Sequence, residues 1–191
     1  MDILKKISES CDYLKSRSEI RPKVAIVLGT GLGNFAEKIA VSDTIPYSEI
    51  PHFKVSTVQG HSGCLIFGHI DGVPVMAMKG RLHYYEGYTM QEITFPIRVM
   101  KAMGIETVMV SNAAGGLNPE YVPGDIMIIK DHINLFPEHP LHGPNIEELG
   151  TRFPDMSNAY DKALVKRALE VGEEKGFGLK CGVYVGTQGP T

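Results

Sequence analysis

The chain has 191 residues, which is long enough for one domain with a substantial hydrophobic core. Hydrophobic residues make up 43% of the sequence, charged residues make up 21%, and the net charge is −3. These values are typical of a globular protein, and they exclude a strongly basic surface for nucleic acid or for an anionic membrane. A small anionic ligand would therefore have to be held by a local cluster of donors.

The sequence contains neither a membrane-spanning run nor a secretion signal. No apolar stretch approaches the roughly 18 residues that a membrane helix needs, and the first residues lack the apolar segment of a signal peptide. Three cysteines, Cys11, Cys64 and Cys181, are scattered singly without a CxxC pair. We therefore expect a cytoplasmic protein with reduced thiols. The histidines form no HExxH-like pattern, so we expect no metal.

Apolar periodicity predicts the first elements in chain order. Residues 2–18 carry apolar side chains at helical spacing and predict a surface helix. Residues 22–28 form a continuous apolar run that ends at a glycine, which is typical of a buried strand. Residues 63–70 and 73–79 flank Asp71-Gly72, a strong signal for a β-hairpin.

A second helix is predicted over residues 89–104. Thr89 and Glu92 have the spacing of a capping box, and Gly104 is suited to the position just after the helix. Pro96 lies inside this helix, removes one backbone donor and is expected to kink it.

The rest of the chain alternates in the same way. Residues 106–112 predict another buried strand, and residues 125–130 predict one more. A loop rich in His, Pro and Gly follows at residues 134–155. Ser157 is expected to cap a helix that runs to Lys175, and residues 181–185 predict a last strand.

This alternation of strands and helices predicts an α/β fold with a mixed, mainly parallel central sheet flanked by helices. With no repeat and no linker, residues 1–191 are expected to form a single domain. The final strand has no following helix to cover it, so we expect the domain to lack C-terminal strands and helices.

A glycine-rich loop follows the first strand, with the sequence Leu28-Gly-Thr-Gly-Leu-Gly33. Glycines allow successive backbone N–H groups to converge on an anion, and the hydroxyl of Thr30 adds a donor. The spacing departs from the dinucleotide-binding fingerprint, because Asn34 stands where that motif needs its last glycine. A purely structural turn is the alternative.

A loop that combines a cation, an imidazole, aromatic rings and a carboxylate follows the third predicted strand, in Gly80-Arg-Leu-His-Tyr-Tyr-Glu-Gly87. Arg81 can fork two N–H groups onto a phosphate, and His83 lies on the same side of an extended backbone. Tyr85 would continue that alternation with an apolar face. Glu86 could orient Arg81 or a neighbouring histidine. The alternative is a surface loop with scattered charges.

Small residues also follow the next strand, in Ser111-Asn-Ala-Ala-Gly-Gly-Leu-Asn-Pro119. Such ends of α/β strands bind ligands through backbone amides, although a tight turn has the same composition. His61, in the glycine-flanked Gln59-Gly-His-Ser-Gly63, is either a ligand contact or an exposed loop histidine. No GxSxG elbow and no Cys–His pair indicate a covalent nucleophile.

Taken together, these segments resemble purine nucleoside phosphorylases of the trimeric, low-molecular-mass class. Similarity runs from about residue 20 to the last residue, and eight motifs occur in order. The matching stretches are VLGTGLG (27–33), STVQGHSG (56–63), MKGRLHYYEGY (78–88), TFPIRVMKAMG (94–104), VSNAAGGLNP (110–119), GDIMIIKDHINL (124–135), RFPDMSNAYD (152–161) and GVYVGTQGPT (182–191).

The resemblance implies phosphorolysis of purine ribonucleosides or deoxyribonucleosides, chiefly 6-oxopurines such as inosine and guanosine, to free base and ribose 1-phosphate. It implies a homotrimer with inorganic phosphate as co-substrate and no cofactor. The implied phosphate-binding positions are Thr30, His61, Arg81, Leu82, His83 and the backbone amide of Ala113. The implied nucleoside-binding positions are Tyr85, Asn112, Tyr184 and, from a neighbouring subunit, Phe153. His83, Tyr85 and Glu86 are the implied catalytic group.

The sequence departs from the family after its GP[ST] step, where members carry the residues that read the purine. Two alternatives therefore stay open: a catalytically incomplete homologue that folds or binds phosphate only, and an activity like that of the related methylthioadenosine phosphorylases. A NAD-binding protein is a more distant alternative, with Glu49 near the place of a ribose-binding acid.

Overall fold

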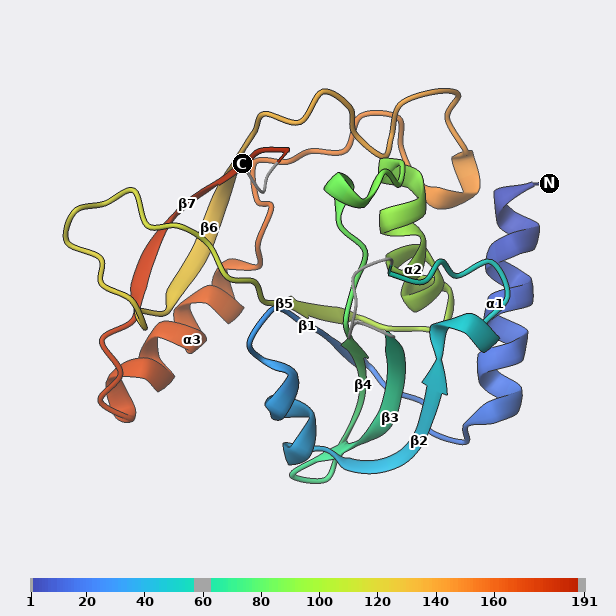
Figure 1. The fold of residues 1–191 in the computed structure, drawn as a ribbon, viewed down its shortest axis with the longest axis horizontal. Coiled ribbons are helices and arrows are strands. Elements are labelled where there is room, and N and C mark those ends of the chain that lie inside the picture. The colour runs from blue at the N-terminus through green and yellow to red at the C-terminus, as the bar shows by residue number, and fades with distance from the viewer. Residues whose placement is uncertain (1, 57–62, 189–191) are drawn as a thin grey trace. The chain divides into compact units, whose positions relative to one another are not determined.

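The structure is a computed structural model that describes residues 2–56 and 63–188 (Figure 1). It divides into two compact units, residues 1–113 and residues 114–191. The candidate anion-binding motifs named above lie in the described part of the first unit, apart from His61 and residues 114–119. That residues 1–191 form one phosphorylase-type domain stays a prediction.

The first unit contains a five-stranded mixed sheet in the order β2-β3-β4-β1-β5. Strand β1 is parallel to both of its neighbours, β4 and β5, whereas β3 is antiparallel to β2 and to β4. Two of the four pairings in this sheet are parallel, which confirms the prediction of an α/β fold around a mixed central sheet. The strand bounds are β1 Val24–Leu28, β2 Ala40–Pro46, β3 Cys64–Ile70, β4 Val73–Lys79 and β5 Thr107–Val110.

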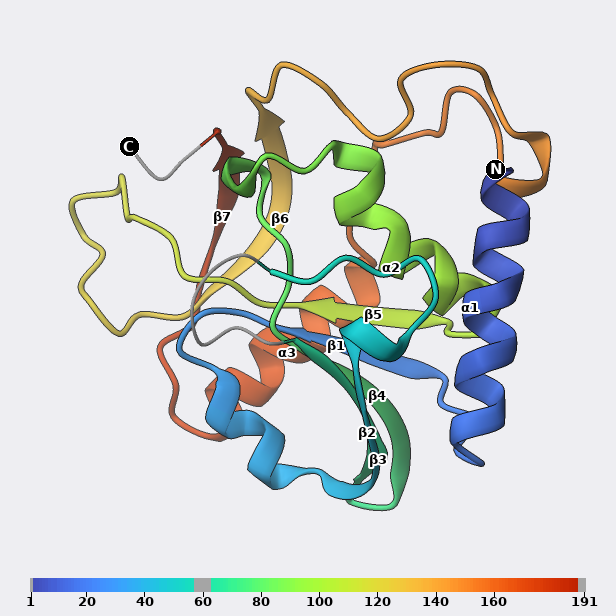
Figure 2. The same ribbon diagram turned by 45° about the vertical axis from the view of Figure 1, so that its right-hand side comes forward.

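Both faces of the central strands are covered. Helices α1 (Ile3–Arg17) and α2 (Met90–Ala102) pack on one face, where Ala25 and Val27 of β1 join their core cluster. Figure 2 shows the two helices together on this side of the sheet. The short 3₁₀ helix η1 (Gly33–Lys38) supplies Ala36 to a second cluster that includes Leu28. Because β1 is covered on both faces, it reads as a continuous apolar run, as the sequence predicts.

The register of the parallel strands brings their carboxyl ends to one edge of the sheet. Leu28 at the end of β1 is paired with Lys79 at the end of β4, and Val27 is paired with Val110 at the end of β5. Helix α2 follows β4 and leads to β5. Strand β5 pairs with β1 on the side opposite to β4. The loops after β1, β4 and β5 therefore start side by side.

The ends of α2 follow the predicted chemistry. The Thr89 hydroxyl accepts a hydrogen bond from the backbone N–H of Glu92 at 3.3 Å, and the Glu92 carboxylate accepts one from the backbone N–H of Thr89 at 3.0 Å. Gly104 adopts φ +93°, a conformation that favours glycine and ends the helix. The capping box is therefore confirmed, and Pro96 lies inside the helix as expected.

Two strand predictions need correction. Residues 106–112 are not a buried strand: β5 covers only Thr107–Val110, and Val108, Met109 and Val110 are exposed. In the described chain β5 pairs with β1 alone, so it is an edge strand with one neighbour. Strand β2 is missing from the prediction, because Ile45 is its one buried residue and apolar alternation is absent.

The second unit contains the parallel pair β6 (Met127–Asn134) and β7 (Lys180–Gly186), with helix α3 (Lys162–Glu174) packed against β6. Residues 135–155 hold one short 3₁₀ helix, η4 (Glu147–Leu149). Among the described residues, no helix is both long and apolar enough to cross a membrane.

The prediction that Ser157 caps the last helix is wrong. Asp161 is the cap of α3, since its Oδ1 accepts hydrogen bonds from the backbone N–H groups of Ala163 at 2.8 Å and Leu164 at 3.0 Å. The backbone N–H of Ser157 instead donates to Asp155 Oδ1 at 2.8 Å. A carboxylate that accepts two amide bonds is a stronger N-cap than a hydroxyl that accepts none.

Candidate functional site

Three loops meet at the carboxyl edge of the first unit's sheet. They begin at Gly29 after β1, at Gly80 after β4 and at Ser111 after β5. Ligands of α/β proteins bind at this kind of edge, because the loops there present backbone amides and variable side chains together. We define the strand-end site as residues 29–30, 80–86 and 111–113.

The loops after β1 and β5 are joined through Ser111. Its hydroxyl donates to the carbonyl oxygen of Val27 and accepts from the backbone N–H of Gly29, each at 3.0 Å. Its backbone N–H also donates to Val27 at 3.1 Å. The sequence prediction did not assign Ser111 a role, although a hydroxyl residue at the end of an apolar run was the available signal.

Arg81 reaches across the end of β1. Its Nη1 donates to the carbonyl oxygen of Leu28 at 3.5 Å and to that of Ser111 at 3.4 Å. Both bonds are long, so each is weak by itself. Together they hold the guanidinium beside the loops after β1 and β5, where it can fork onto an anion.

Glu86 is bound to His83 twice. One carboxylate oxygen, Oε1, accepts from the His83 backbone N–H at 2.8 Å and lies 2.9 Å from His83 Nδ1. The other oxygen, Oε2, accepts from the hydroxyl of Ser56 at 2.8 Å. The Glu86 side chain is 1% exposed, so the carboxylate is buried and fixed from both ends. Of the two partners predicted for Glu86, Arg81 or a neighbouring histidine, the structure shows these contacts with His83, and that Glu86 orients the ring stays a prediction.

Tyr85 does not continue an extended alternation from Arg81 and His83. Residues Tyr84–Glu86 form a 3₁₀ turn, η3, which Gly87 ends with φ +90°. The Tyr85 ring instead stacks on the His83 ring, with centroids 4.9 Å apart and an interplanar angle of 16°. Tyr85 is 49% exposed, so one side of the ring remains open to a ligand.

The remaining first-unit candidates differ in burial. Leu82 is buried, so only its backbone is suited to ligand contact. Thr30 is exposed just after β1. The Asn112 side chain donates to the carbonyl oxygen of Ala113 at 3.0 Å. This bond shapes the backbone of the third loop.

A buried tyrosine supports the start of the second loop. The hydroxyl of Tyr47, in the 3₁₀ helix η2 (Tyr47–Glu49), donates to the carbonyl oxygen of Gly80 at 2.7 Å. Burial raises the pKa of Tyr47 far above its ordinary value, so the phenol stays protonated as a donor. Burial likewise raises the pKa of the nearby Cys64 thiol, which makes this cysteine a poor nucleophile.

Three predicted site residues are not part of this cluster. His61 lies outside the described residues. Tyr184 and Phe153 belong to the second unit, where the Tyr184 ring lies edge-on to His132 with centroids 5.6 Å apart. Phe153 is 85% exposed beside the guanidinium of Arg152, 5.7 Å from its ring centre.

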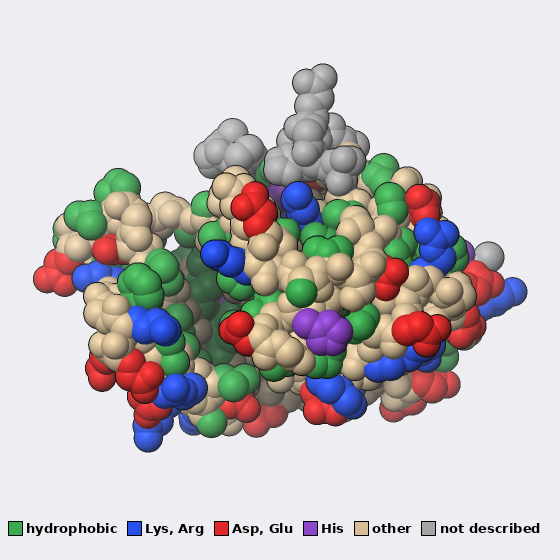
Figure 3. Space-filling view, turned by 90° about the horizontal axis from the view of Figure 1, so that it is seen from below, with side chains coloured by type: hydrophobic (Ala, Val, Ile, Leu, Met, Phe, Trp, Pro, Cys, Tyr) green, Lys and Arg blue, Asp and Glu red, His purple; other side chains and the backbone are tan. Residues whose placement is uncertain are grey.

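Charge on the molecular surface does not by itself define an anion site. On the face shown in Figure 3, Lys and Arg side chains are interspersed with Asp and Glu. Among the described residues, no group of three or more His, Cys, Asp or Glu side chains is arranged to hold a metal ion.

Comparisons with known proteins identify the family of the chain. Residues 23–191 match the family model described as the phosphorylase superfamily. Purine nucleoside phosphorylase 1 of Geobacillus stearothermophilus is 50% identical over 184 residues, which are 96% of this chain and 67% of that protein. The chain belongs to the purine nucleoside phosphorylase family.

Solved structures of this family share the fold. A purine nucleoside phosphorylase in complex with ribose-1-phosphate aligns with TM-score 0.92 at 46% identity, over 98% of this chain and 71% of that one. A Schistosoma purine nucleoside phosphorylase in complex with hypoxanthine aligns with TM-score 0.90 at 45% identity, over 98% and 68% of the two chains. The present chain thus spans about two thirds of the length of these phosphorylases.

Membership of the phosphorylase family leaves no support for a NAD site at Glu49. This carboxylate accepts a hydrogen bond from the Tyr13 hydroxyl at 3.2 Å and pairs with Arg17 at 3.6 Å. Both partners lie on α1, so Glu49 ties η2 to that helix.

Proposed function

We propose that this protein cleaves purine nucleosides with inorganic phosphate, and that the strand-end site binds the phosphate. The observation that carries the proposal is the convergence of Arg81, His83 and the loops at Gly29 and Ser111 on one sheet edge. A bidentate cation, an imidazole and backbone amides are together suited to a phosphate dianion.

In the proposed reaction, the bond between C1′ of the ribose and N9 of the purine breaks, and its electron pair moves to the base. Positive charge develops on the ribose, and a phosphate oxygen then bonds to C1′ to give ribose 1-phosphate. The protein needs no nucleophile of its own. Its contribution is to hold phosphate in line with C1′ and to stabilise the developing charges.

The proposed roles follow the resemblance and the geometry. Phosphate contacts are assigned to Thr30, His61, Arg81, Leu82, His83 and the amide of Ala113. Nucleoside contacts are assigned to Tyr85, whose exposed ring stacks on His83, and to Asn112 and Tyr184. Glu86 orients His83.

The exposed ring of Phe153 supports a homotrimer in which this residue completes a neighbouring subunit's nucleoside pocket. We further propose a cytoplasmic enzyme without a cofactor, with phosphate as its second substrate. For the base, we propose 6-oxopurines, as the resemblance implies; relatives of 45% identity are in complex with hypoxanthine and with adenosine.

The function is tested by incubating the 191-residue chain with inosine and measuring hypoxanthine release with and without phosphate. We expect release that requires phosphate and is accompanied by ribose 1-phosphate. Methylthioadenosine is the parallel substrate for the alternative activity, and faster cleavage of it would contradict the assignment to purine nucleosides.

A second candidate, binding of phosphate without turnover, is favoured by one observation. The described members of the phosphate cluster all lie within residues 1–113, a compact unit by itself. Saturable binding of radiolabelled phosphate without hypoxanthine release would favour this candidate over the enzyme.

A further inference from the structure

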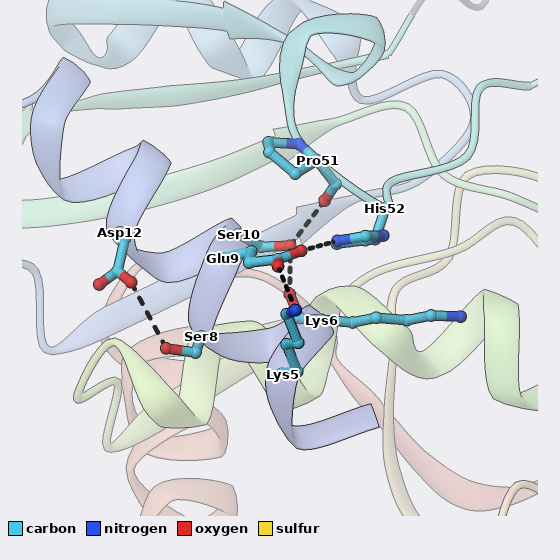
Figure 4. Close-up of polar contacts among 8 residues, drawn as sticks. All are labelled: Lys5, Lys6, Ser8, Glu9, Ser10, Asp12, Pro51 and His52. Atoms are coloured by element: carbon cyan, nitrogen blue, oxygen red, sulfur yellow. Dashed lines mark hydrogen bonds and ion pairs between the residues drawn. The ribbon is translucent and has the colours of Figure 1, made fainter. Parts of the chain in front are cut away.

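Residues 50–56, which we call the connecting segment, follow η2 and end at Ser56, which contacts Glu86 of the strand-end site. The N-terminal part of this segment is bound to α1. The buried hydroxyl of Ser10 donates to the carbonyl oxygen of Pro51 at 2.6 Å. His52, which has φ +66°, places Nε2 2.5 Å from Glu9 Oε2 (Figure 4). The pKa of Glu9 is lowered by this bond, which favours the ionised carboxylate as a partner.

The connecting segment is then anchored near the start of α2. The hydroxyl of Tyr88 donates to the carbonyl oxygen of Val55 at 2.7 Å, and Lys54 pairs with Glu92 at 3.4 Å. With contacts at residues 51, 52, 54 and 55, the backbone just before Ser56 is held from two helices. These contacts place Ser56 beside Glu86, which lies 30 residues further along the chain.

The two oxygens of Glu86 have separate partners. Oε2 accepts a hydrogen bond from the Ser56 hydroxyl at 2.8 Å. Oε1 accepts one from the backbone N–H of His83 at 2.8 Å and lies 2.9 Å from Nδ1 of the His83 ring. An ionised carboxylate has no hydrogen to donate, so a bond to it requires that Nδ1 carry the hydrogen. In the neutral ring, Nε2 then bears the lone pair.

We propose that Ser56 is a positioning residue, which fixes the Glu86 carboxylate so that His83 keeps its hydrogen on Nδ1 and presents Nε2 to bound phosphate. This inference rests on the proposed function only for the identity of the ligand. Neutral Nε2 accepts from a phosphate hydroxyl, whereas the protonated ring donates Nε2–H to the dianion. Without the Ser56 bond, the carboxylate loses one of the contacts that fix its orientation, so its bond to Nδ1 is less constrained.

The test uses Ser56→Ala, the conservative Ser56→Thr and Ser56→Val, which has the shape of threonine without its hydroxyl. The ring nitrogens of His83 are observed by ¹⁵N NMR in the ligand-free protein, at a pH where the ring is neutral. We expect the wild type and Ser56→Thr to show the Nδ1–H tautomer. Ser56→Ala and Ser56→Val should show a mixture of the two tautomers.

Phosphate kinetics give the second readout. Loss of one hydrogen bond to a buried carboxylate predicts an increase of about tenfold in KM for phosphate for the Ala and Val variants, with Thr close to wild type. Ser8→Ala is the matched control, because within the described part of the chain the Ser8 hydroxyl bonds to Asp12 on the exposed side of α1, at 3.4 Å. It should change neither readout.

An unchanged Nδ1–H tautomer in both Ala and Val variants would overturn the positioning role. If Ser56→Ala does not fold, the Thr and Val variants, which differ only in the hydroxyl, still decide the question. A tautomer shift in a protein whose wild type binds no phosphate would support the role of Ser56 while contradicting the proposed function. The two proposals therefore fail separately.

Discussion

A β-carbon on Gly29 would lie 2.3 Å from the carbonyl oxygen of Ser111, closer than atoms of folded proteins approach. The same β-carbon would lie 2.7 Å from the Cα of Asn112. Both neighbours are backbone atoms, which cannot rotate away as a flexible side chain can. Glycine at position 29 therefore lets the loops after β1 and β5 come together at the strand-end site.

Replacing Gly29 with alanine should push these two loops apart. We expect Gly29→Ala to lower the free energy of unfolding by about 1–3 kcal/mol and to weaken phosphate binding. Gly33→Ala is the matched control, because nothing lies within 4 Å of its β-carbon position and its φ is not positive. Isothermal titration with phosphate measures the binding, and equal affinities for the two variants would contradict the close-approach argument.

Removing the Ser111 hydroxyl should loosen the same junction. Ser111→Ala deprives Val27 of a donor and Gly29 of an acceptor, so we expect a loss of about 1–2 kcal/mol in the free energy of unfolding. Ser111→Thr retains the hydroxyl and should lose less. Since the chain contains no tryptophan, urea unfolding is best followed by far-UV circular dichroism. A larger loss for threonine than for alanine would count against the bridge.

Arg81→Lys should weaken phosphate binding more than nucleoside binding. Lysine keeps the positive charge but has a single nitrogen in place of the planar guanidinium. It therefore cannot bind the carbonyl oxygens of Leu28 and Ser111 and also donate two parallel hydrogen bonds to an anion. We expect KM for phosphate to rise by about tenfold or more, with a smaller change for inosine. Arg17→Lys, on α1, is the control. Equal increases in KM for the two substrates would argue against a phosphate contact.

The cap of α2 should make stability depend on pH. The pKa of Glu92 is lowered, first by the hydrogen bond from the Thr89 backbone N–H and further by Lys54. A carboxyl group with a lower pKa when folded contributes stability above its ordinary pKa, and the contribution is lost as pH falls through the folded value. Because the side chain is 35% exposed, solvent screening keeps this contribution below about 1 kcal/mol.

Glu92→Gln tests this pH dependence, since glutamine can form the capping box without a charge. The wild type should be more stable than Glu92→Gln at pH 7, and the difference should vanish by about pH 3. Urea unfolding at the two pH values measures it. A difference that is the same at both would show that charge has no part in the cap.

Local patterning was sufficient to predict strands β1 and β4, which precede two of the three loops of the strand-end site. β1 and β4 are covered on both faces, so their apolar runs are unbroken, and the Asp71-Gly72 turn sets the hairpin register. Strand β2 escaped prediction because it pairs only with β3 in the described chain, is shifted in register near Val41 and ends at Pro46. An edge strand with one buried residue leaves little periodicity to detect.

The partners of the site residues were harder to predict than the residues themselves. Arg81, His83 and Glu86 stand close together in one motif, so their cooperation is visible in the sequence. Ser111 and Ser56 are joined to this motif only by the tertiary fold, across 30 residues in each case. A hydroxyl residue in a loop carries no local sign of the partner it meets.

The most direct test of the central claim is a titration of the ¹⁵N-labelled chain with phosphate, followed by backbone amide chemical shifts. We predict saturable shifts at Gly29, Thr30, His83 and Ala113, which weaken in Arg81→Lys. Shifts centred elsewhere, such as at the lysines around α3, or no saturable shift at all, would contradict a phosphate site at the ends of β1, β4 and β5.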